Sequence, residues 1–298
     1  VRKKNGGVLR ERTLARFHVI QQFENEYPLG LMCRALEVSR TGYHAFRTRR
    51  PSARAQEDRE LVAEIEQVQR KFRHAYGSPR MWRALRARGR TCGRHRIARL
   101  QREHGLGARR KRRRKRLTDS NHRFPCAENL LARQFRVEAP NQVWVSDVTC
   151  VWTREGWLYL AVILDLYSRK VVGWGMGPEN DTALVLRALA MAALRRHPPA
   201  GLIFHSDRGS TYAAHAFQAA LRRLGFAPSM SRKGDCWDNA VAESFFASLK
   251  TEWLDEDGYE TRGRAMREVF AYIEMFYNPC RRHSHLGYVS PTAFEADR

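Results

Sequence analysis

Three carboxylates in the second half of the sequence have the chemistry of a metal-dependent phosphodiester site. Asp147 lies within a run of β-branched and aromatic residues, Asp207 ends another such run, and Glu243 lies early in a helical pattern. Hard divalent cations such as Mg²⁺ prefer carboxylate ligands. Two such ions roughly 3.5–4 Å apart can activate an attacking oxygen and stabilise the leaving oxygen of a phosphodiester. The three residues are therefore candidate ligands for two Mg²⁺ ions, with Mn²⁺ as a substitute.

Each carboxylate also has an ordinary structural explanation. Alternation places Asp147 on the strand face of three valines, where a structural aspartate would need hydrogen bonds: Val143, Val145 and Val151. Asp207 could serve as a turn residue, and Glu243 could be a surface glutamate favoured by the helix dipole. Three further aspartates are expected at a strand end, in a loop and at a helix cap, and rank below the others as ligands: Asp165, Asp235 and Asp238.

Lys250 follows Glu243 by seven residues and so lies on nearly the same face of the expected helix. That position would direct a cation toward phosphates beside the carboxylates. The packing face of this helix would hold Phe246, Leu249 and Trp253.

The elements that must hold these residues begin at residue 141. Hydrophobic patterns predict five strands at 143–152, 158–166, 170–176, 202–206 and 226–230. They predict four helices at 181–196, 212–224, 238–254 and 262–277, with a hairpin turn at 154–156. Three strands, a helix, a strand, a helix, a strand and two helices form the order of an RNase H-like domain. The expected fold class is α/β, with a mixed five-stranded sheet flanked by helices.

The positive charge is concentrated in the first two-fifths of the chain. The net charge is +23, and residues 1–120 contain 33 Lys and Arg against 11 Asp and Glu. A one-sided surplus over folded segments indicates a polyanion partner, and nucleic acid is favoured over a membrane surface. The sequence contains no apolar run of about 18 residues, and its six cysteines include no CxxC pair. We therefore expect a cytoplasmic, nucleoid-associated protein that does not bind membranes.

Two helical regions are expected in the basic part. Residues 14–50 have a helix-turn-helix-like pattern, with a turn and cap at 38–42. Residues 57–107 predict three helices; Leu61, Ile65 and Val68 share one face, and Ser78-Pro79 supplies an N-cap and first-turn proline. Binding of DNA is the favoured interpretation, and a plain three-helix bundle is the alternative. The expected domains are 1–56, 57–108, a linker at 109–140, and a catalytic core at 141–298.

Eight consecutive basic residues begin the expected linker. Such a run repels itself and stays extended in solution. It could track DNA phosphates between two DNA-contacting domains, which would add affinity and salt dependence without sequence choice. A solubilising linker and a nuclear signal are the alternatives. The residues are Arg109, Arg110, Lys111, Arg112, Arg113, Arg114, Lys115 and Arg116.

Taken together with their neighbours, these residues resemble a known family. The chain is similar to the second-frame transposases of bacterial insertion sequences, whose full transposase arises by frameshift fusion of two reading frames and whose catalytic part is related to retroviral integrases. The matching stretches are VWVSDVTCVW, LDLYSRKVVGW, HSDRGSTYAA, SMSRKGDCWDNAVAESFFASLKTEW and FYNPCRRHSHLGYVSPTAFE. Two upstream stretches, YPLGLMCRALEVSRTGYHAF and YGSPRMWRAL, also match, so the resemblance covers most of the chain.

The resemblance implies roles for individual residues. Asp147, Asp207 and Glu243 would form the metal-binding triad, and the 35 residues between Asp207 and Glu243 match the family's spacing. Lys250 would contact DNA. Three residues in the matching blocks would support the site: His205, Asn239 and Arg232. Four more belong to the C-terminal matching block without an assigned role: Tyr277, Asn278, Arg282 and His283.

The implied reaction is metal-dependent strand cleavage at the ends of an insertion sequence, followed by transfer of a 3′ hydroxyl to a target phosphodiester. The implied partners are the element's ends, target DNA and further copies of the chain on DNA. The family's first-frame segment, with its helix-turn-helix and leucine zipper, would join as a fusion or a separate partner. Two other functions stay open: a DNA-binding regulator with an inactive core, and an RNase H-type nuclease or junction resolvase that cuts without joining.

Overall fold

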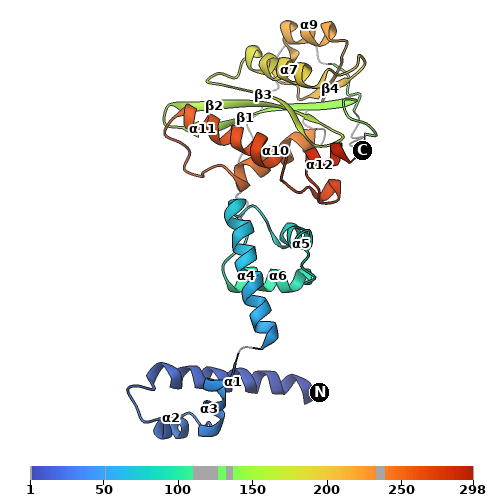
Figure 1. Cartoon of the computed structure of the whole chain (residues 1–298). Coiled ribbons are helices and arrows are strands. Elements are labelled where there is room, and N and C mark those ends of the chain that lie inside the picture. Colours follow the sequence, from blue (N-terminus) through green and yellow to red (C-terminus); the bar gives the residue numbers. More distant parts are fainter. Residues whose placement is uncertain (1, 51, 110–126, 132–136, 233–238, 298) are drawn as a thin grey trace. The chain divides into compact units, whose positions relative to one another are not determined.

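The computed structural model describes residues 2–50, 52–109, 127–131, 137–232 and 239–297 (Figure 1). The chain divides into two compact units, residues 1–61 and 62–298. The basic residues 110–116, together with Asp235 and Asp238, lie outside the described residues. Within the described ranges, we find no helix whose length and apolar character would let it cross a membrane.

The first unit contains three helices before the start of α4. Helices α1 (Arg2–Phe23), α2 (Leu29–Ala35) and α3 (Arg40–Thr48) enclose a small core that includes Ile20 and Tyr43. The Ser39 side chain accepts the Gly42 amide at 2.9 Å and caps α3. The expected helices within 14–50, and the cap between them, are therefore confirmed.

The second unit begins with a small helical region formed by the second half of α4 (Ala53–Lys71) with α5 (Ser78–Arg86) and α6 (Arg94–Glu103). Residues 62–109, called the three-helix region below, bury Ile65 and Val68 as the spacing predicted. The buried Gln69 amide ties the region together by donating to the Tyr76 and Leu106 carbonyls. The expected cap of α5 was wrong by one residue, because Gly77 is the N-cap and Ser78 is already helical.

The rest of the second unit is built on a mixed five-stranded sheet in the order β3-β2-β1-β4-β5. The long strands β1 (Val143–Thr153), β2 (Gly156–Asp165) and β3 (Val171–Gly177) form an antiparallel meander. The short strands β4 (Ile203–Ser206) and β5 (Ala227–Met230) extend it in parallel from β1. This arrangement confirms the expected α/β, RNase H-like fold and the positions of all five expected strands.

Helices cover both faces of the sheet (Figure 1). Helix α7 (Thr182–Arg196) and α9 (His215–Arg223) lie on one face, and α10 (Ala240–Glu252) and α11 (Arg262–Phe270) lie on the other. Helix α7 packs so closely on β3 that a Cβ added to Gly173 would lie 2.3 Å from the Ala188 carbonyl oxygen. Only glycine permits this approach of helix to strand.

Two expected helices are divided in the structure. The helix expected at 212–224 is split into α8 (Ser210–Ala213) and α9, because the backbone of Ala214 is extended, with φ −57° and ψ 138°. The helix expected at 262–277 changes after α11 into a π-helix, Ala271–Tyr277. A 3₁₀ turn at Ser284–Leu286 and the short helix α12 (Pro291–Ala296) follow, neither of which the hydrophobic pattern predicted.

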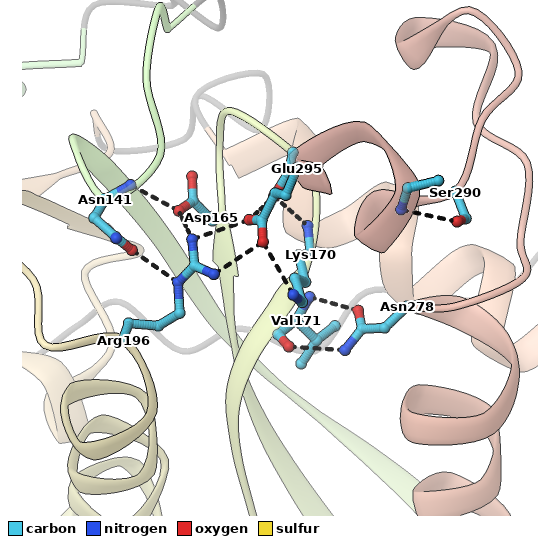
Figure 2. A network of polar contacts seen from close by, with 10 residues as sticks. Asn141, Asp165, Lys170, Val171, Arg196, Asn278, Ser290 and Glu295 are labelled. Atoms are coloured by element: carbon cyan, nitrogen blue, oxygen red, sulfur yellow. Dashed lines mark hydrogen bonds and ion pairs between the residues drawn. The ribbon is translucent and has the colours of Figure 1, made fainter. Parts of the chain in front are cut away.

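A buried ionic network fastens α12 to the end of β2 (Figure 2). Asp165 is fully buried and accepts the backbone amides of Asn141 and Tyr167 at 2.8 and 3.0 Å. Arg196 donates both to Asp165 and to Glu295 of α12. Burial raises the pKa of Asp165, while these hydrogen bonds and Arg196 oppose the shift. These partners explain Asp165 as a structural residue of the network.

Candidate active site

Asp147 and Asp207 lie on neighbouring strands. Trp144 and Val148 belong to the core beneath α7, so alternation along β1 turns Asp147 toward α10. Strands β1 and β4 are parallel, and Val145 pairs with His205. That is the last β1–β4 pair, so Asp147 lies two residues beyond it on β1, and Asp207 directly follows the end of β4 at Ser206. The fold therefore brings two residues that are 60 positions apart in the sequence to one edge of the sheet.

The backbone around Asp207 holds its side chain at the carboxyl end of β4. Strand β4 ends at Ser206, and the Asp207 Oδ1 atom accepts the Gly209 amide at 2.9 Å. A Cβ added to Gly209 would lie 2.9 Å from that same oxygen, so a larger residue would displace the carboxylate. Asp207 thus has the turn contact considered above, and this contact helps to fix the position of its carboxylate.

The negative charges of both aspartates affect the pKa of the buried Tyr212 hydroxyl. Tyr212 is 1% exposed and shares a hydrogen bond of 2.8 Å with the Ser146 hydroxyl, next to Asp147. Burial, followed by the negative charge of Asp147, raises the pKa of Tyr212 well above its ordinary value, and Asp207 adds to the rise. Two carboxylates so placed raise the electrostatic demand for a cation at this edge of the sheet.

Helix α10 carries Glu243 in its first turn. The helix buries Ala242, Phe245 and Leu249 and leaves the Glu243 side chain half-buried. Asn239 is its N-cap residue, and the Asn239 Nδ2 atom donates to the Ser146 carbonyl at 3.4 Å. The start of α10 is therefore joined to β1 at the residue before Asp147.

The donor set suits a hard divalent cation, although the three carboxylates are not gathered into one cluster. Among the residues that the structure describes, no three His, Cys, Asp or Glu side chains lie close enough together to hold a metal ion. The donors are all carboxylates, the type that Mg²⁺ prefers. The buried Asn239 Oδ1 atom, beside β1, has no hydrogen-bond partner within the described ranges and is a further oxygen of the required kind.

The other expected site residues lie around this edge of the sheet or outside it. His205 is fully buried on β4, with its ring nitrogens 2.9 and 3.2 Å from the Ser229 and Ser231 hydroxyls, so it joins β4 to the end of β5. Arg232 is exposed, and Lys250 is half-buried in the last turn of α10. Arg109 is exposed at the end of the three-helix region.

The C-terminal matching block has structural contacts that sequence reasoning did not assign. The Asn278 side chain both donates to and accepts from the backbone of Val171 at 2.9 Å, and so fastens β3. Arg282 donates to the Tyr288 carbonyl at 2.9 Å. Tyr277 is buried, and burial followed by the charge of Arg281 lowers the pKa of His283 to about 2.

A cavity of about 430 Å³ lies along α10 beside Glu243. Small side chains of α10 line it, together with three charged residues that sequence reasoning missed: Arg80, Glu252 and Arg281. One signal was available for Glu252. An acidic residue at the C-terminal end of a helix opposes the helix dipole, which indicates a specific cationic partner.

Comparison with protein families finds matches along most of the chain. The family described as "Integrase core domain" matches residues 137–236, and a second family of the same description matches 224–291. The family described as "HTH-like domain" matches 55–115. The chain is 46% identical over 263 residues to the "Insertion element IS600 uncharacterized 31 kDa protein" of Shigella sonnei, covering 88% of this chain and 97% of that protein. It is 40% identical over 278 residues to "Transposase InsF for insertion sequence IS3A" of Escherichia coli (strain K12), covering 93% and 96%.

Two solved structures are more distant. One is a chain of the simian T-cell lymphotropic virus intasome in complex with the PP2A regulatory subunit B56 gamma, with 17% identity, 60% coverage of each chain and a TM-score of 0.45. The other is the HTLV-2 integrase catalytic core domain in complex with magnesium, with 16% identity, 54% coverage of this chain, 99% of that chain and a TM-score of 0.40.

Proposed function

This chain belongs to the insertion-sequence transposases that carry an integrase core domain, and we propose that Asp147, Asp207 and Glu243 are its catalytic carboxylates. It is a DNA transposase of the DDE type, a polynucleotidyl transferase whose family depends on divalent metal ions. The observation that carries the triad is the parallel pairing of β1 with β4. That pairing puts the strand of Asp147 beside the strand that leads into Asp207, and α10, which bears Glu243, contacts β1, which supports the proposal.

The three carboxylates would hold two Mg²⁺ ions, or Mn²⁺ as a substitute. Bound ions would supply charge neutralisation at the phosphorus and a more acidic attacking oxygen. The chain's own residues would orient the DNA around them. In the first step water cleaves the strand and leaves a 3′ hydroxyl at the element's end. In the second step that hydroxyl attacks a target phosphodiester, forming one new P–O bond as another breaks, without a covalent bond between protein and DNA.

The basic half of the chain would hold the DNA. The match to an HTH-like domain at 55–115 supports a DNA-binding role for residues 57–108, and the basic run 109–116 would follow phosphates from a linker at 109–140. Residues 1–56 would be a further helical domain, and 141–298 the catalytic core. We expect the enzyme to act in the cytoplasm, on the nucleoid, as an oligomer assembled on DNA, with first-frame protein as a fusion or separate partner.

A strand-joining assay tests this function. The purified chain, with Mg²⁺ or Mn²⁺, is expected to cleave a labelled duplex carrying the element's end and to join it to target DNA. Cleavage without joining would support a nuclease or resolvase instead. Binding without cleavage, both for this chain and for its fusion to the first-frame segment, would support a regulator with an inactive core.

Replacing Lys250 with alanine is expected to weaken contact with the element's ends. The half-buried lysine lies two turns after Glu243, so its ammonium group would meet phosphates next to the carboxylates. Crosslinking of Lys250→Ala to labelled ends should fall, and the salt dependence of binding should decrease by about one unit of slope. Metal binding, followed by calorimetry, should stay unchanged. Crosslinking equal to that of the wild type would remove Lys250 from the DNA contacts.

A further inference from the structure

The last residue of α10 is a buried glutamate shared by two arginines from distant parts of the chain. Glu252 is 8% exposed. Its carboxylate accepts the Nε and Nη2 atoms of Arg281, both at 2.6 Å, and the Nη1 atom of Arg80 at 2.9 Å. An acid at this end of a helix is unfavourable by itself, because the helix dipole is negative there. The two guanidinium groups therefore decide where the end of α10 can lie.

Arg281 holds α10 at two successive turns. It is 4% exposed, and besides its two bonds to Glu252 it donates from Nη2 to the Ser248 hydroxyl at 2.8 Å. The forked, two-point contact with a carboxylate has a fixed plane. Contacts to residues four positions apart on one helix face fix both the rotation and the height of that helix.

Arg80 connects the same carboxylate to the three-helix region. It lies at the start of α5, 172 residues before Glu252, and its side chain is 25% exposed. Arg73 makes a parallel contact, because it pairs with Glu268 at 2.8 Å and lies over the Trp253 ring at 4.3 Å. The end of α10 is thus one place where the three-helix region contacts the core; the Tyr76 hydroxyl makes another contact, to the Cys280 carbonyl at 3.0 Å.

Helix α10 transmits this placement to Glu243. The nine residues from Glu243 to Glu252 span about 13.5 Å of continuous helix. At the other end, the bond from Asn239 to the Ser146 carbonyl is long, at 3.4 Å. A change at the Glu252 end would therefore alter the rotation of the helix, and with it the position of the Glu243 carboxylate relative to Asp147 and Asp207.

We propose that Arg281, Glu252 and Arg80 are positioning residues, which set the rotation of α10, and with it the Glu243 carboxylate, according to the seating of the three-helix region. This proposal rests on the proposed catalytic role of Glu243. A DNA end bound to the three-helix region would then have two effects. It would bring the scissile phosphate to the site, and it would align the Glu243 carboxylate through contacts within the protein.

Arg80→Ala removes the contact of the three-helix region with Glu252 and leaves the Arg281–Glu252 pair in place. Single-turnover cleavage of a bound, labelled duplex carrying the element's end should slow roughly 10- to 100-fold, since a displacement of about 1 Å has an effect of that size. Affinity for the duplex should stay within about two-fold, because a positioning residue acts on the chemical step. The matched control is Arg154→Ala, which removes an exposed arginine of the core that pairs with Glu260, and which should cleave like the wild type.

Hydrogen exchange gives a readout that does not need catalysis. In Arg80→Ala without DNA, amides of residues 240–252 should exchange faster than in the wild type, while those of β2 keep their protection. Arg281→Lys should retain the charge but lose the fork, and should show the same faster exchange. Wild-type exchange and wild-type cleavage in Arg80→Ala would overturn the proposal. If Glu243→Gln cleaves normally, the proposed function fails, and the exchange result still decides whether the two regions are coupled.

Discussion

Glu243→Gln is expected to lose strand cleavage and strand joining together, by roughly 10³-fold or more. The amide keeps the size of the side chain but removes the negative charge that a divalent ion requires. Affinity for the element's ends should change by less than about two-fold, because phosphate contacts from basic residues supply most of the binding energy. Asp147→Asn and Asp207→Asn should behave in the same way, since the proposed metal site needs the negative charge of each of the three carboxylates.

The measurement compares cleavage and joining of a labelled end with gel-shift binding, for each variant. Glu260→Gln is the matched control, because Glu260 is an exposed acid that forms a surface pair with Arg154. It should retain wild-type activity. Normal activity in any one amide variant would remove that residue from the triad, and loss of binding in step with activity would point to misfolding instead of lost catalysis.

Arg196→Met is expected to lower the free energy of unfolding by about 3–5 kcal/mol, because it leaves buried carboxylates without their main cation. Arg196 donates to the Asn141 side chain, to Asp165 and twice to Glu295 (Figure 2). Methionine fills similar space but supplies none of these bonds. Urea denaturation followed by circular dichroism, at about pH 7, would measure the loss.

The difference in free energy of unfolding between Arg196→Met and the wild type should become smaller as the pH falls. Burial raises the pKa of Asp165, so its protonation relieves an uncompensated charge, and the variant recovers stability toward acid pH. The pKa of Glu295 is lowered, because hydrogen bonds from Ser168, Arg196 and Lys170 outweigh its burial. Its contribution in the wild type is present above the ordinary pKa of a glutamate and is lost as the pH falls through the lowered value. Both effects reduce the difference in free energy of unfolding between the variant and the wild type at acid pH.

The neighbouring Arg195 offers a control for the network. Its side chain is 43% exposed and pairs with Glu274 at 2.8 Å. An exposed pair of this kind contributes about 0–1 kcal/mol after solvent screening, so Arg195→Met should be nearly neutral. Equal losses in the two variants would show that burial of the Arg196 network adds nothing.

Local patterns in the sequence were sufficient for the sheet. Alternation in residues 143–152 and 158–166 reflects one face turned to α7 and one to α10, so both strands of the hairpin could be located within two residues. Asp207 could be placed at a strand end because the apolar run stops at Phe204 and the Gly209 turn follows. The two aspartates could be paired only once the resemblance to a family was known, since nothing local specifies that β1 lies beside β4.

Contacts between distant residues could not be predicted. The break at Ala214 has no proline or glycine to mark it; it follows the burial of Tyr212 against Ser146, 66 residues earlier. The position of Glu252 at the end of α10 indicates a cationic partner, but nothing local identifies Arg80 and Arg281 as those partners. Likewise, the sequence does not indicate that the Asn278 side chain forms hydrogen bonds with the backbone of Val171, on the edge strand β3.

The α12 network has a consequence for how the protein is made. Glu295 bonds to side chains 99, 125 and 127 residues earlier, in Arg196, Lys170 and Ser168. A ribosome adding about 5–20 residues per second needs roughly 6–25 s to pass from Ser168 to Glu295. During that time Asp165, at the end of β2, lacks the part of its ionic network that Glu295 supplies. The core therefore reaches its full stability only after Glu295 has been synthesised, 127 residues after Ser168.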